Sequence, residues 1–202
     1  MKTIAWNVDT QYDFMSPLGK LYVQGAEDIE PNLERLTEHF RDEGMTIVNT
    51  ADCHNKDSGE LSDKPDFMSS FPEHCMRGSK GVGYIMETRP NAPYVVDWQD
   101  KDVDLEKLAN SREIVMYKDK FDIFSGNPHA DKVLEALEPD RVIVYGVATN
   151  VCVDFAVRGL LSRGKEVYVV EDAIKELPNI PSPVEDWKRL GAKLIKAEDL
   201  YR

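Results

Sequence analysis

The sequence is poor in cysteine, and the cysteines it has are not spaced for pairing or for binding zinc. Only Cys53, Cys75 and Cys152 occur among 202 residues, and no two of them form a CxxC motif. An odd number without close pairs argues against a disulfide framework and against a cysteine-based structural zinc site. We therefore expect three reduced thiols, each either a small buried apolar side chain or a reactive group.

Long apolar runs and basic clusters are also missing. No run approaches the length of a membrane span, and the first residues, MKTIAWNVD, lack the apolar segment and cleavage site of a signal peptide, so we expect a cytoplasmic protein. A net charge of -12 without a basic cluster argues against nucleic acid or an anionic membrane as partner. A small substrate of little charge fits better.

Short β-rich runs alternate with helix-like patterns along the chain. The runs cover residues 2–9, 45–52, 113–119, 141–148, 166–173 and 192–197. The helix-like patterns cover residues 29–44, 127–139, 152–164 and 182–191, and each ends at glycine or proline. This alternation predicts an α/β three-layer sandwich: a six-stranded, mostly parallel sheet with helices on both faces. We expect a single domain over residues 1–202.

The segment from about 53 to 112 breaks this alternation. It contains Pro65, Pro72, Pro90 and Pro93 and many polar residues over a length that no simple connection needs. Long irregular insertions in compact α/β domains are usually functional or disordered. Within it we interpret the charged run 99–107 as a solvated surface.

Chemically reactive residues follow four of the predicted strands. Asp9 ends the first, Asp52-Cys53-His54 the second and Lys118-Asp119-Lys120 the third, while the fourth runs through Val147-Ala148 toward Cys152. Each of these residues has an ordinary structural explanation when taken alone. Because ligand crevices in open parallel sheets form at the carboxyl ends of the strands, their agreement indicates a site.

Cys152 lies where a helix should begin, and free backbone N–H groups there would favour its thiolate. A nearby carboxylate such as Asp9 could accept the thiol proton and return it to a leaving amine, and a lysine would add positive charge. A Cys-Asp-Lys catalytic set is therefore chemically plausible.

A second group has the character of a metal site. Asp52 and His54 are two residues apart in a strand-like segment and project to the same side, and Glu60 and His74 follow in the insertion. Mixed nitrogen and oxygen ligands suit Zn, Mn or Fe. Glu60 has three rivals in the same stretch: Asp57, Asp63 and Asp66.

At this point the sequence resembles a known family, the isochorismatase-like cysteine hydrolases, and within it the nicotinamidases. The matching stretches are VDTQYDF (8–14), TADCH (50–54), FPEHCMRGSKG (71–81), YKDKFDIF (117–124), GVATNVCV (146–153) and VYVVEDA (167–173). They follow the family's order and span nearly the whole chain. Many metal-free members lack the Asp-x-His pair and the later histidine, so their presence favours a nicotinamidase.

The resemblance implies a role for each residue of the catalytic set. Asp9 becomes the general base and acid, Lys118 the charge-stabilising residue, with Lys120 as the alternative, and Cys152 the nucleophile. It also implies a cis peptide bond between Val147 and Ala148, and an oxyanion hole formed by the N–H groups of Ala148 and Cys152.

For the metal, the resemblance implies one divalent ion held by Asp52, His54 and His74, with Glu60 in a variable fourth place. Zinc is the first expectation; a carboxylate in place of an imidazole shifts the preference toward Mn or Fe. Homo-oligomers are common among relatives, which is analogy only.

The implied reaction is hydrolysis of the carboxamide C–N bond of nicotinamide through a thioester. Phe14, together with Phe67 or Phe71, would contact the substrate ring. The alternatives are a hydrolase of another small amide, such as an N-carbamoyl compound, and a catalytically silent protein that binds metal or ligand. Cys53 and Cys75 are expected to be packing residues.

Overall fold

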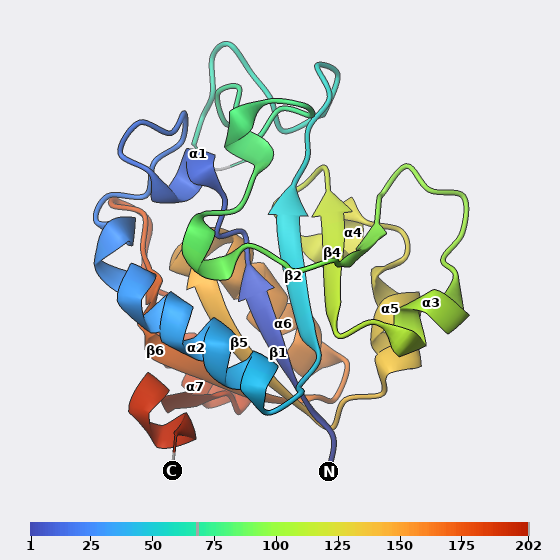
Figure 1. The fold of residues 1–202 in the computed structure, drawn as a ribbon. Helices are drawn as coiled ribbons and strands as arrows, with labels where there is room; N and C mark the ends of the chain where they lie inside the picture. The colour runs from blue at the N-terminus through green and yellow to red at the C-terminus, as the bar shows by residue number, and fades with distance from the viewer. Residues whose placement is uncertain (68, 202) are drawn as a thin grey trace.

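A parallel sheet of seven strands forms the centre of the computed structural model, which describes residues 1–67 and 69–201 (Figure 1). The strand order is β3-β4-β2-β1-β5-β6-β7, and each neighbouring pair is parallel. The strands are β1 (Thr3–Val8), β2 (Ile47–Asp52), β3 (Tyr94–Val96), β4 (Glu113–Lys118), β5 (Arg141–Val147), β6 (Glu166–Lys175) and β7 (Lys193–Ile195). Their carboxyl ends therefore share one edge of the sheet.

Helices connect and cover these strands. They are α1 (Tyr12–Met15), α2 (Glu30–Asp42), α3 (Leu105–Asn110), α4 (Ile123–Gly126), α5 (Ala130–Leu137), α6 (Asp154–Ser162) and α7 (Val184–Leu190). Short turns of 3-10 helix are η1 (Ala26–Ile29), η2 (Lys80–Val82), η3 (Met86–Thr88) and η5 (Ala197–Leu200), and η4 (Thr149–Val153) is a π-helical turn. Among the described residues, no helix is both long enough and apolar enough to cross a bilayer.

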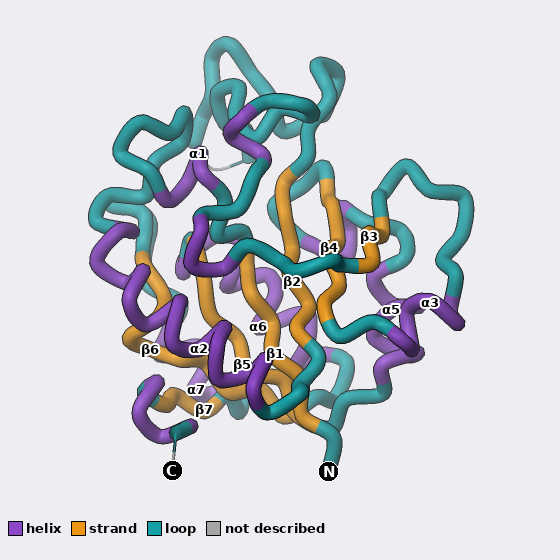
Figure 2. The backbone as a smooth tube through the Cα atoms, in the orientation of Figure 1, coloured by secondary structure: helices purple, strands orange, loops and turns teal. Residues whose placement is uncertain are grey.

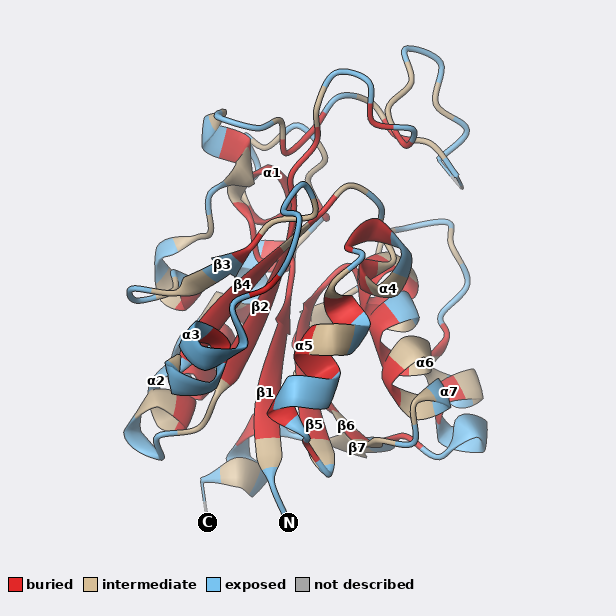
Figure 3. Ribbon diagram, turned by 90° about the vertical axis from the view of Figure 1, so that its right-hand side faces the viewer, coloured by how far each residue is buried: buried red, intermediate tan, exposed pale blue. Residues whose placement is uncertain are grey.

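The two faces of the sheet bury separate apolar clusters, because successive strand residues point to opposite faces. On one face Trp6 packs with residues of α5, α6 and α7; on the other, Ala5 packs with the buried stripe of α2. Figure 3 shows the buried strands between helices whose exposed residues face outward. The predicted α/β sandwich with helices on both faces is confirmed.

All six predicted strands and all four predicted helices are present, but the sheet has a seventh strand. β3 pairs only with β4, in the register Tyr94↔Ile114, and forms one edge of the sheet. With three residues directly after Pro93, it is too short to show the alternation by which strands are recognised. The prediction of six strands was therefore wrong.

The charged run 99–107 is not entirely a solvated surface. Val103 is buried within the apolar cluster, and α3 begins at Leu105. Asp104 caps this helix by accepting a hydrogen bond from the Lys107 N–H (3.1 Å). One of the charged residues that made this run look like solvated surface, Asp104, is therefore the capping residue of α3.

An irregular segment covers the carboxyl edge of the sheet. Residues 53–67 and 69–83 run mostly as loops beyond the ends of β2 and β1, at the top of Figure 2, and the chain then returns past α2 through η3; both chain termini lie at the opposite edge. Isolated bridges join His54 to Met76 and Leu61 to Phe71, so the segment folds back on itself. The site predicted at the strand ends thus lies beneath this cover.

Candidate active site

Asp9 is held rigidly at the end of β1. Its N–H donates to Thr50 O (3.2 Å), and Thr50 Oγ1 donates to Asp9 Oδ1 (2.6 Å). The backbone turns here in the left-handed region, with a φ of 47°, which is uncommon for residues other than glycine and is often found at functional sites. The carboxylate is completely buried. Asp9 is therefore fixed in direction and shielded from bulk water.

Lys118, at the end of β4, joins the two predicted clusters. Its Nζ lies 2.9 Å from Asp9 Oδ2, forms an ion pair with Asp52, and lies 3.8 Å from Cys152 Sγ. The side chain is only 1% exposed, whereas Lys120 is exposed at the surface. The structure thus brings together Asp9, Lys118 and Cys152, and it does so with Lys118 rather than Lys120.

Cys152 follows β5 through an unusual turn. The predicted cis peptide bond between Val147 and Ala148 is confirmed. Gly146 has a φ of 117°, and a Cβ there would come 2.1 Å from Val8 O, so only glycine allows β5 to lie this close to β1. Ala148 and Cys152 both line the pocket described below. Their oxyanion-binding role stays a prediction.

The electrostatics of the catalytic set keep a proton on Cys152. Burial raises the pKa of this thiol well above its usual value; Lys118 opposes the shift, but Asp9 and Asp52 reinforce it. Cys152 lies within η4, directly before α6, and faces the carboxylates of Asp9 and Asp52, which oppose the thiolate that a helix start would favour.

Burial likewise raises the pKa of Asp9, and Lys118 only partly offsets the effect. For Lys118, burial opposes the charged form, but the carboxylates of Asp52 and Asp9 raise its pKa well above the usual range. Lys118 is therefore a permanent positive charge next to Asp9. A carboxylate with a raised pKa is a stronger base than an ordinary aspartate and can take a proton from a neighbouring thiol.

Asp52, His54 and His74 form a second buried cluster. One potential ligand atom from each lies within 4.8 Å of the others. Burial would raise the pKa of Asp52, but the positive charge of Lys118 and the two neighbouring histidines hold it well below its usual range. The carboxylate is therefore ionised and available to a cation.

The histidines are arranged as metal ligands are. His74 Nδ1 lies 2.7 Å from Pro72 O; since a carbonyl can only accept, Nδ1 carries the proton and leaves the lone pair on Nε2, 3.6 Å from Asp52. His54 is fully buried, and neither ring nitrogen has a hydrogen-bond partner. Orphaned buried nitrogen atoms are costly unless something binds them. These residues therefore fit a divalent cation.

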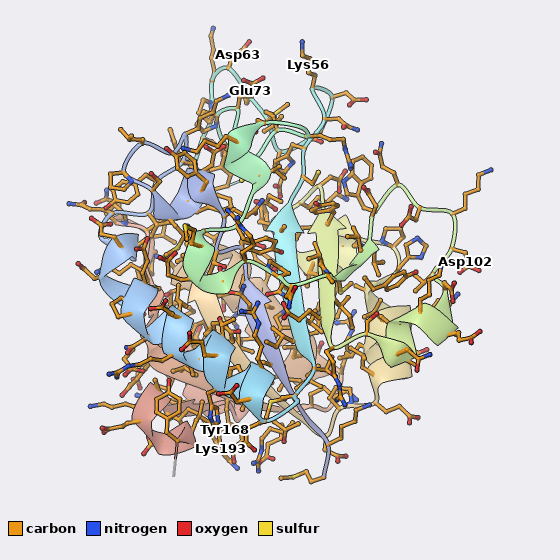
Figure 4. All side chains as sticks on the ribbon, in the orientation of Figure 1. Lys56, Asp63, Glu73, Asp102, Tyr168 and Lys193 are labelled. Atoms are coloured by element: carbon orange, nitrogen blue, oxygen red, sulfur yellow. The ribbon has the colours of Figure 1, made fainter. Side chains whose placement is uncertain are left out.

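Glu60 is the carboxylate that approaches this cluster. Its side chain is buried, with Oε2 3.9 Å from His54 Nε2, and Phe121 N–H donates to Oε1. Burial and the charge of Asp52 raise the pKa of Glu60 to about 8. Its rivals are all exposed: Asp57, Asp63 and Asp66. Figure 4 shows Asp63 at the outer tip of the covering segment, pointing away from the protein.

A pocket opens onto both clusters, with Asp52, His74 and Cys152 in its lining. Of the phenylalanines predicted to contact the substrate, Phe14 and Phe71 lie in its wall and Phe67 does not; substrate contact itself stays a prediction. Phe67 is 53% exposed and contacts the edge of the Phe71 ring instead, so its prediction as a substrate contact is corrected. Its backbone lies in the left-handed region, with a φ of 57°.

Five apolar wall residues were missed from the sequence: Leu21, Val23, Phe121, Val151 and Leu177. Phe121 could have been found, because it lies only three residues beyond Lys118. Leu177 could not: its backbone N–H and C=O bind the side chain of Asn150, a contact made across the sheet edge that no local pattern reveals.

Cys53 and Cys75 are free and buried, and neither belongs to the pocket wall as described. Burial raises the pKa of Cys53 to about 11 and that of Cys75 well above its usual value. Both are therefore neutral thiols at physiological pH. Their burial agrees with the prediction that they pack rather than react.

The sequence was compared with models of known protein families and with curated proteins. The model of the isochorismatase domain matches residues 6–190. A search of curated protein sequences gives no significant match.

Solved structures share the fold over nearly the whole chain. N-carbamoylsarcosine amidase from Thermoplasma acidophilum has a TM-score of 0.75 at 24% identity, covering 98% of both chains. Pyrazinamidase of Pyrococcus horikoshii in complex with zinc has a TM-score of 0.74 at 24% identity, covering 97% of this chain and 99% of the other. Pyrazinamidase/nicotinamidase from Streptococcus mutans has a TM-score of 0.71 at 24% identity, with coverage of 96% and 100%. At such identity these likenesses show a common fold.

Proposed function

The chain belongs to the isochorismatase family of hydrolases, and on that basis we propose that it is a cysteine amidohydrolase that converts nicotinamide to nicotinate and ammonia. One observation carries the proposal: the buried contacts of Lys118 with Asp9, Asp52 and Cys152, which join a nucleophile and its base to a cation-binding cluster. A pocket with aromatic walls, lined by Cys152 and by residues of the cation-binding cluster, suits an aromatic amide.

In the acylation half of the reaction, Asp9 removes the proton of the Cys152 thiol as sulfur attacks the amide carbon. The N–H groups of Ala148 and Cys152 then donate to the oxyanion, and Lys118 keeps the proton-transfer site positively charged. Asp9 returns the proton to the amide nitrogen, the C–N bond breaks, and ammonia leaves a thioester on Cys152.

In the deacylation half, Asp9 is again a carboxylate. It takes a proton from a water molecule whose oxygen attacks the thioester carbon, the C–S bond breaks, and Asp9 returns that proton to Cys152. The product leaves as nicotinic acid and gives its own proton to water to become nicotinate. Asp9 thus acts twice as base and twice as acid. The raised pKa of Asp9 suits a group that must both take and return a proton near neutral pH.

Asp52, His54 and His74 would hold a divalent cation, with Glu60 beside them. When bound, such a cation supplies a Lewis acid at the pocket that can orient an electron-donating atom of the substrate. Zinc is the first candidate, supported by the zinc complex of the similar pyrazinamidase, and the carboxylates keep manganese and iron as alternatives. A cytoplasmic location and a homo-oligomer remain predictions.

A second substrate class deserves the same assay, because one of the similar structures is an N-carbamoylsarcosine amidase. The catalytic set would be unchanged, and only the pocket wall would select the substrate. A silent ligand-binding protein is less well supported, since a scaffold has no need to bury Asp9, Lys118 and Cys152 in mutual contact.

The test is ammonia release from nicotinamide and from an N-carbamoyl amino acid, with and without a chelator, by wild type, Cys152→Ala and the control Cys53→Ala. We expect release from nicotinamide that Cys152→Ala abolishes and Cys53→Ala retains. Activity in Cys152→Ala would rule out the thioester mechanism, and turnover of the N-carbamoyl compound alone would assign the second substrate class. Full activity after metal removal would rule out a role for the cation.

A further inference from the structure

Two polar side chains at the start of α1 are buried but take no part in the proposed reaction. Gln11 is fully buried and Asp13 is 4% exposed, and both belong to the stretch VDTQYDF together with Asp9 and Phe14. Buried polar groups are retained only when their hydrogen bonds are satisfied. The partners of these two side chains therefore indicate what they do.

Gln11 binds the backbone of Asp52 on both sides. Its Oε1 accepts from Asp52 N–H (2.7 Å), and its Nε2 donates to Asp52 O (2.8 Å) and to Val82 O (2.9 Å). This arrangement extends the hydrogen bonding of β2 at its last residue. The main chain that carries the Asp52 carboxylate cannot rotate without breaking two buried hydrogen bonds.

Asp13 binds the part of the insertion that carries the histidine ligands. Its Oδ2 accepts from Cys75 N–H (2.7 Å), directly after His74, and the Cys75 carbonyl accepts from His54 N–H (3.1 Å). A Cβ at Gly81 would come 1.9 Å from Asp13 Oδ2, so the insertion packs directly against this carboxylate. Asp13 thus holds the backbone of Cys75, which follows His74 and accepts a hydrogen bond from the backbone of His54.

We propose that Gln11 and Asp13 are positioning residues of the metal centre, setting the spacing between Asp52 on β2 and the histidines of the insertion. The inference rests on the proposed cation site but not on the substrate or the thioester. Asp52 and His74 come from different segments, which also meet directly at the bridge between His54 and Met76, and both are tied to one turn of three residues. Outer partners of this kind usually change metal affinity 10- to 100-fold.

The chain offers a matched control in Asn127. This carboxamide is 1% exposed, donates to Val96 O (3.0 Å) and Tyr117 O (2.7 Å), and accepts from His129 N–H (2.8 Å). It therefore has the same hydrogen bonds as Gln11, two donated to carbonyls and one accepted from a backbone N–H, but none involves a proposed ligand residue.

The experiment compares Gln11→Glu with Asn127→Asp, each an isosteric change that removes two donors. Zn²⁺ affinity is measured by competition with a chromogenic chelator, the visible spectrum is recorded with Co²⁺, and the unfolding temperature is measured without metal. We expect similar losses of metal-free stability, at least a tenfold loss of Zn²⁺ affinity and an altered Co²⁺ spectrum in Gln11→Glu alone, and affinity within twofold of wild type in Asn127→Asp.

Equal Zn²⁺ affinity in Gln11→Glu and wild type, or an equal loss in Asn127→Asp, would overturn the inference. If Gln11→Glu does not fold, Asp13→Asn replaces it, because that change leaves the bonds of Gln11 intact and is held to the same tenfold criterion. A wild-type protein that binds neither Zn²⁺ nor Co²⁺ would also overturn it. Normal metal binding without ammonia release would instead count only against the proposed function.

Discussion

Lys118 Nζ lies 2.9 Å from Asp9 Oδ2, and both side chains are sealed from solvent. The same ammonium pairs with Asp52, so one positive charge serves two carboxylates that belong to different parts of the site. Desolvating three charges is costly, and their mutual attraction compensates only while all three are present. Loss of Lys118, which pairs with both Asp9 and Asp52, should therefore destabilise the fold as well as the site.

Replacing Lys118 by methionine leaves two buried carboxylates without their counter-ion. We expect the free energy of unfolding near neutral pH to fall by about 3–5 kcal/mol, and ammonia release in the folded fraction to fall about 100-fold or more. Chemical denaturation and initial rates measure the two effects. Lys120→Met is the control, since Lys120 is exposed, and an equal effect there would contradict the assignment.

The raised pKa of Asp9 predicts an acid limb in the pH profile. Asp9 must be ionised to accept the thiol proton, and burial raises its pKa above the ordinary 3.8, so kcat/KM should fall as the pH decreases while still above that value. Thr50→Val removes a hydrogen bond that stabilises the ionised form and should move the limb to higher pH. A limb in Thr50→Val that does not move, or moves to lower pH, would contradict this account.

The parts of the site that follow from parallel strand topology could be predicted from the sequence. Asp9, Lys118 and Cys152 are far apart in the chain, but the carboxyl ends of parallel strands share one edge, and the structure brings these residues together there. The strand pattern therefore carried enough information to expect them as neighbours.

Features set by packing of irregular segments could not be predicted in this way. Phe67 and Phe71 have the same side chain in the same insertion, and only the fold decides that Phe71 enters the wall while Phe67 stays exposed. The edge strand at 94–96 and the raised pKa of Cys152 likewise depend on neighbours distant in sequence. Local patterns contain no information about such neighbours.

Glu60 should contribute to cation affinity although it lies slightly outside the tightest ligand group. Its Oε2 is 3.9 Å from His54 Nε2, a distance that a shared cation would bridge. We expect Glu60→Gln to lower Zn²⁺ affinity at least about tenfold, and to lower Mn²⁺ affinity more, since Mn²⁺ prefers carboxylate oxygen. Chelator competition measures both. Asp57→Asn, an exposed rival, should bind both ions as wild type does; a loss there equal to that in Glu60→Gln would reassign the ligand.

The pocket wall predicts different roles for two phenylalanines. Phe71→Leu removes an aromatic surface next to His74 and should raise KM for nicotinamide about 3- to 10-fold, corresponding to an aromatic contact of about 0.5–1.5 kcal/mol. Phe67→Leu should leave KM within about twofold, because that ring is exposed and lies outside the wall. Initial rates over a range of nicotinamide concentrations test both, and equal KM values in the two variants would contradict the assignment of Phe71.

Away from the site, Glu166 joins three strands through charge. It accepts hydrogen bonds from Arg141 of β5 (2.9 Å) and Lys193 of β7. The cationic groups of Arg141 and Lys193 also lie over the ring of Tyr168, at the edge of the sheet opposite the pocket (Figure 4). Hydrogen bonds from Lys193 and Arg141 lower the pKa of Glu166 to about 2.

A carboxylate whose pKa is lower in the folded state than in the unfolded state stabilises the fold at pH values above its unfolded pKa. It loses that contribution as the pH falls through its folded-state pKa. Glu166→Gln should therefore unfold at a lower temperature than wild type at pH 6, and the difference should shrink between about pH 4.5 and pH 2. A difference that stayed constant over this range would show that shape, and not charge, accounts for the effect.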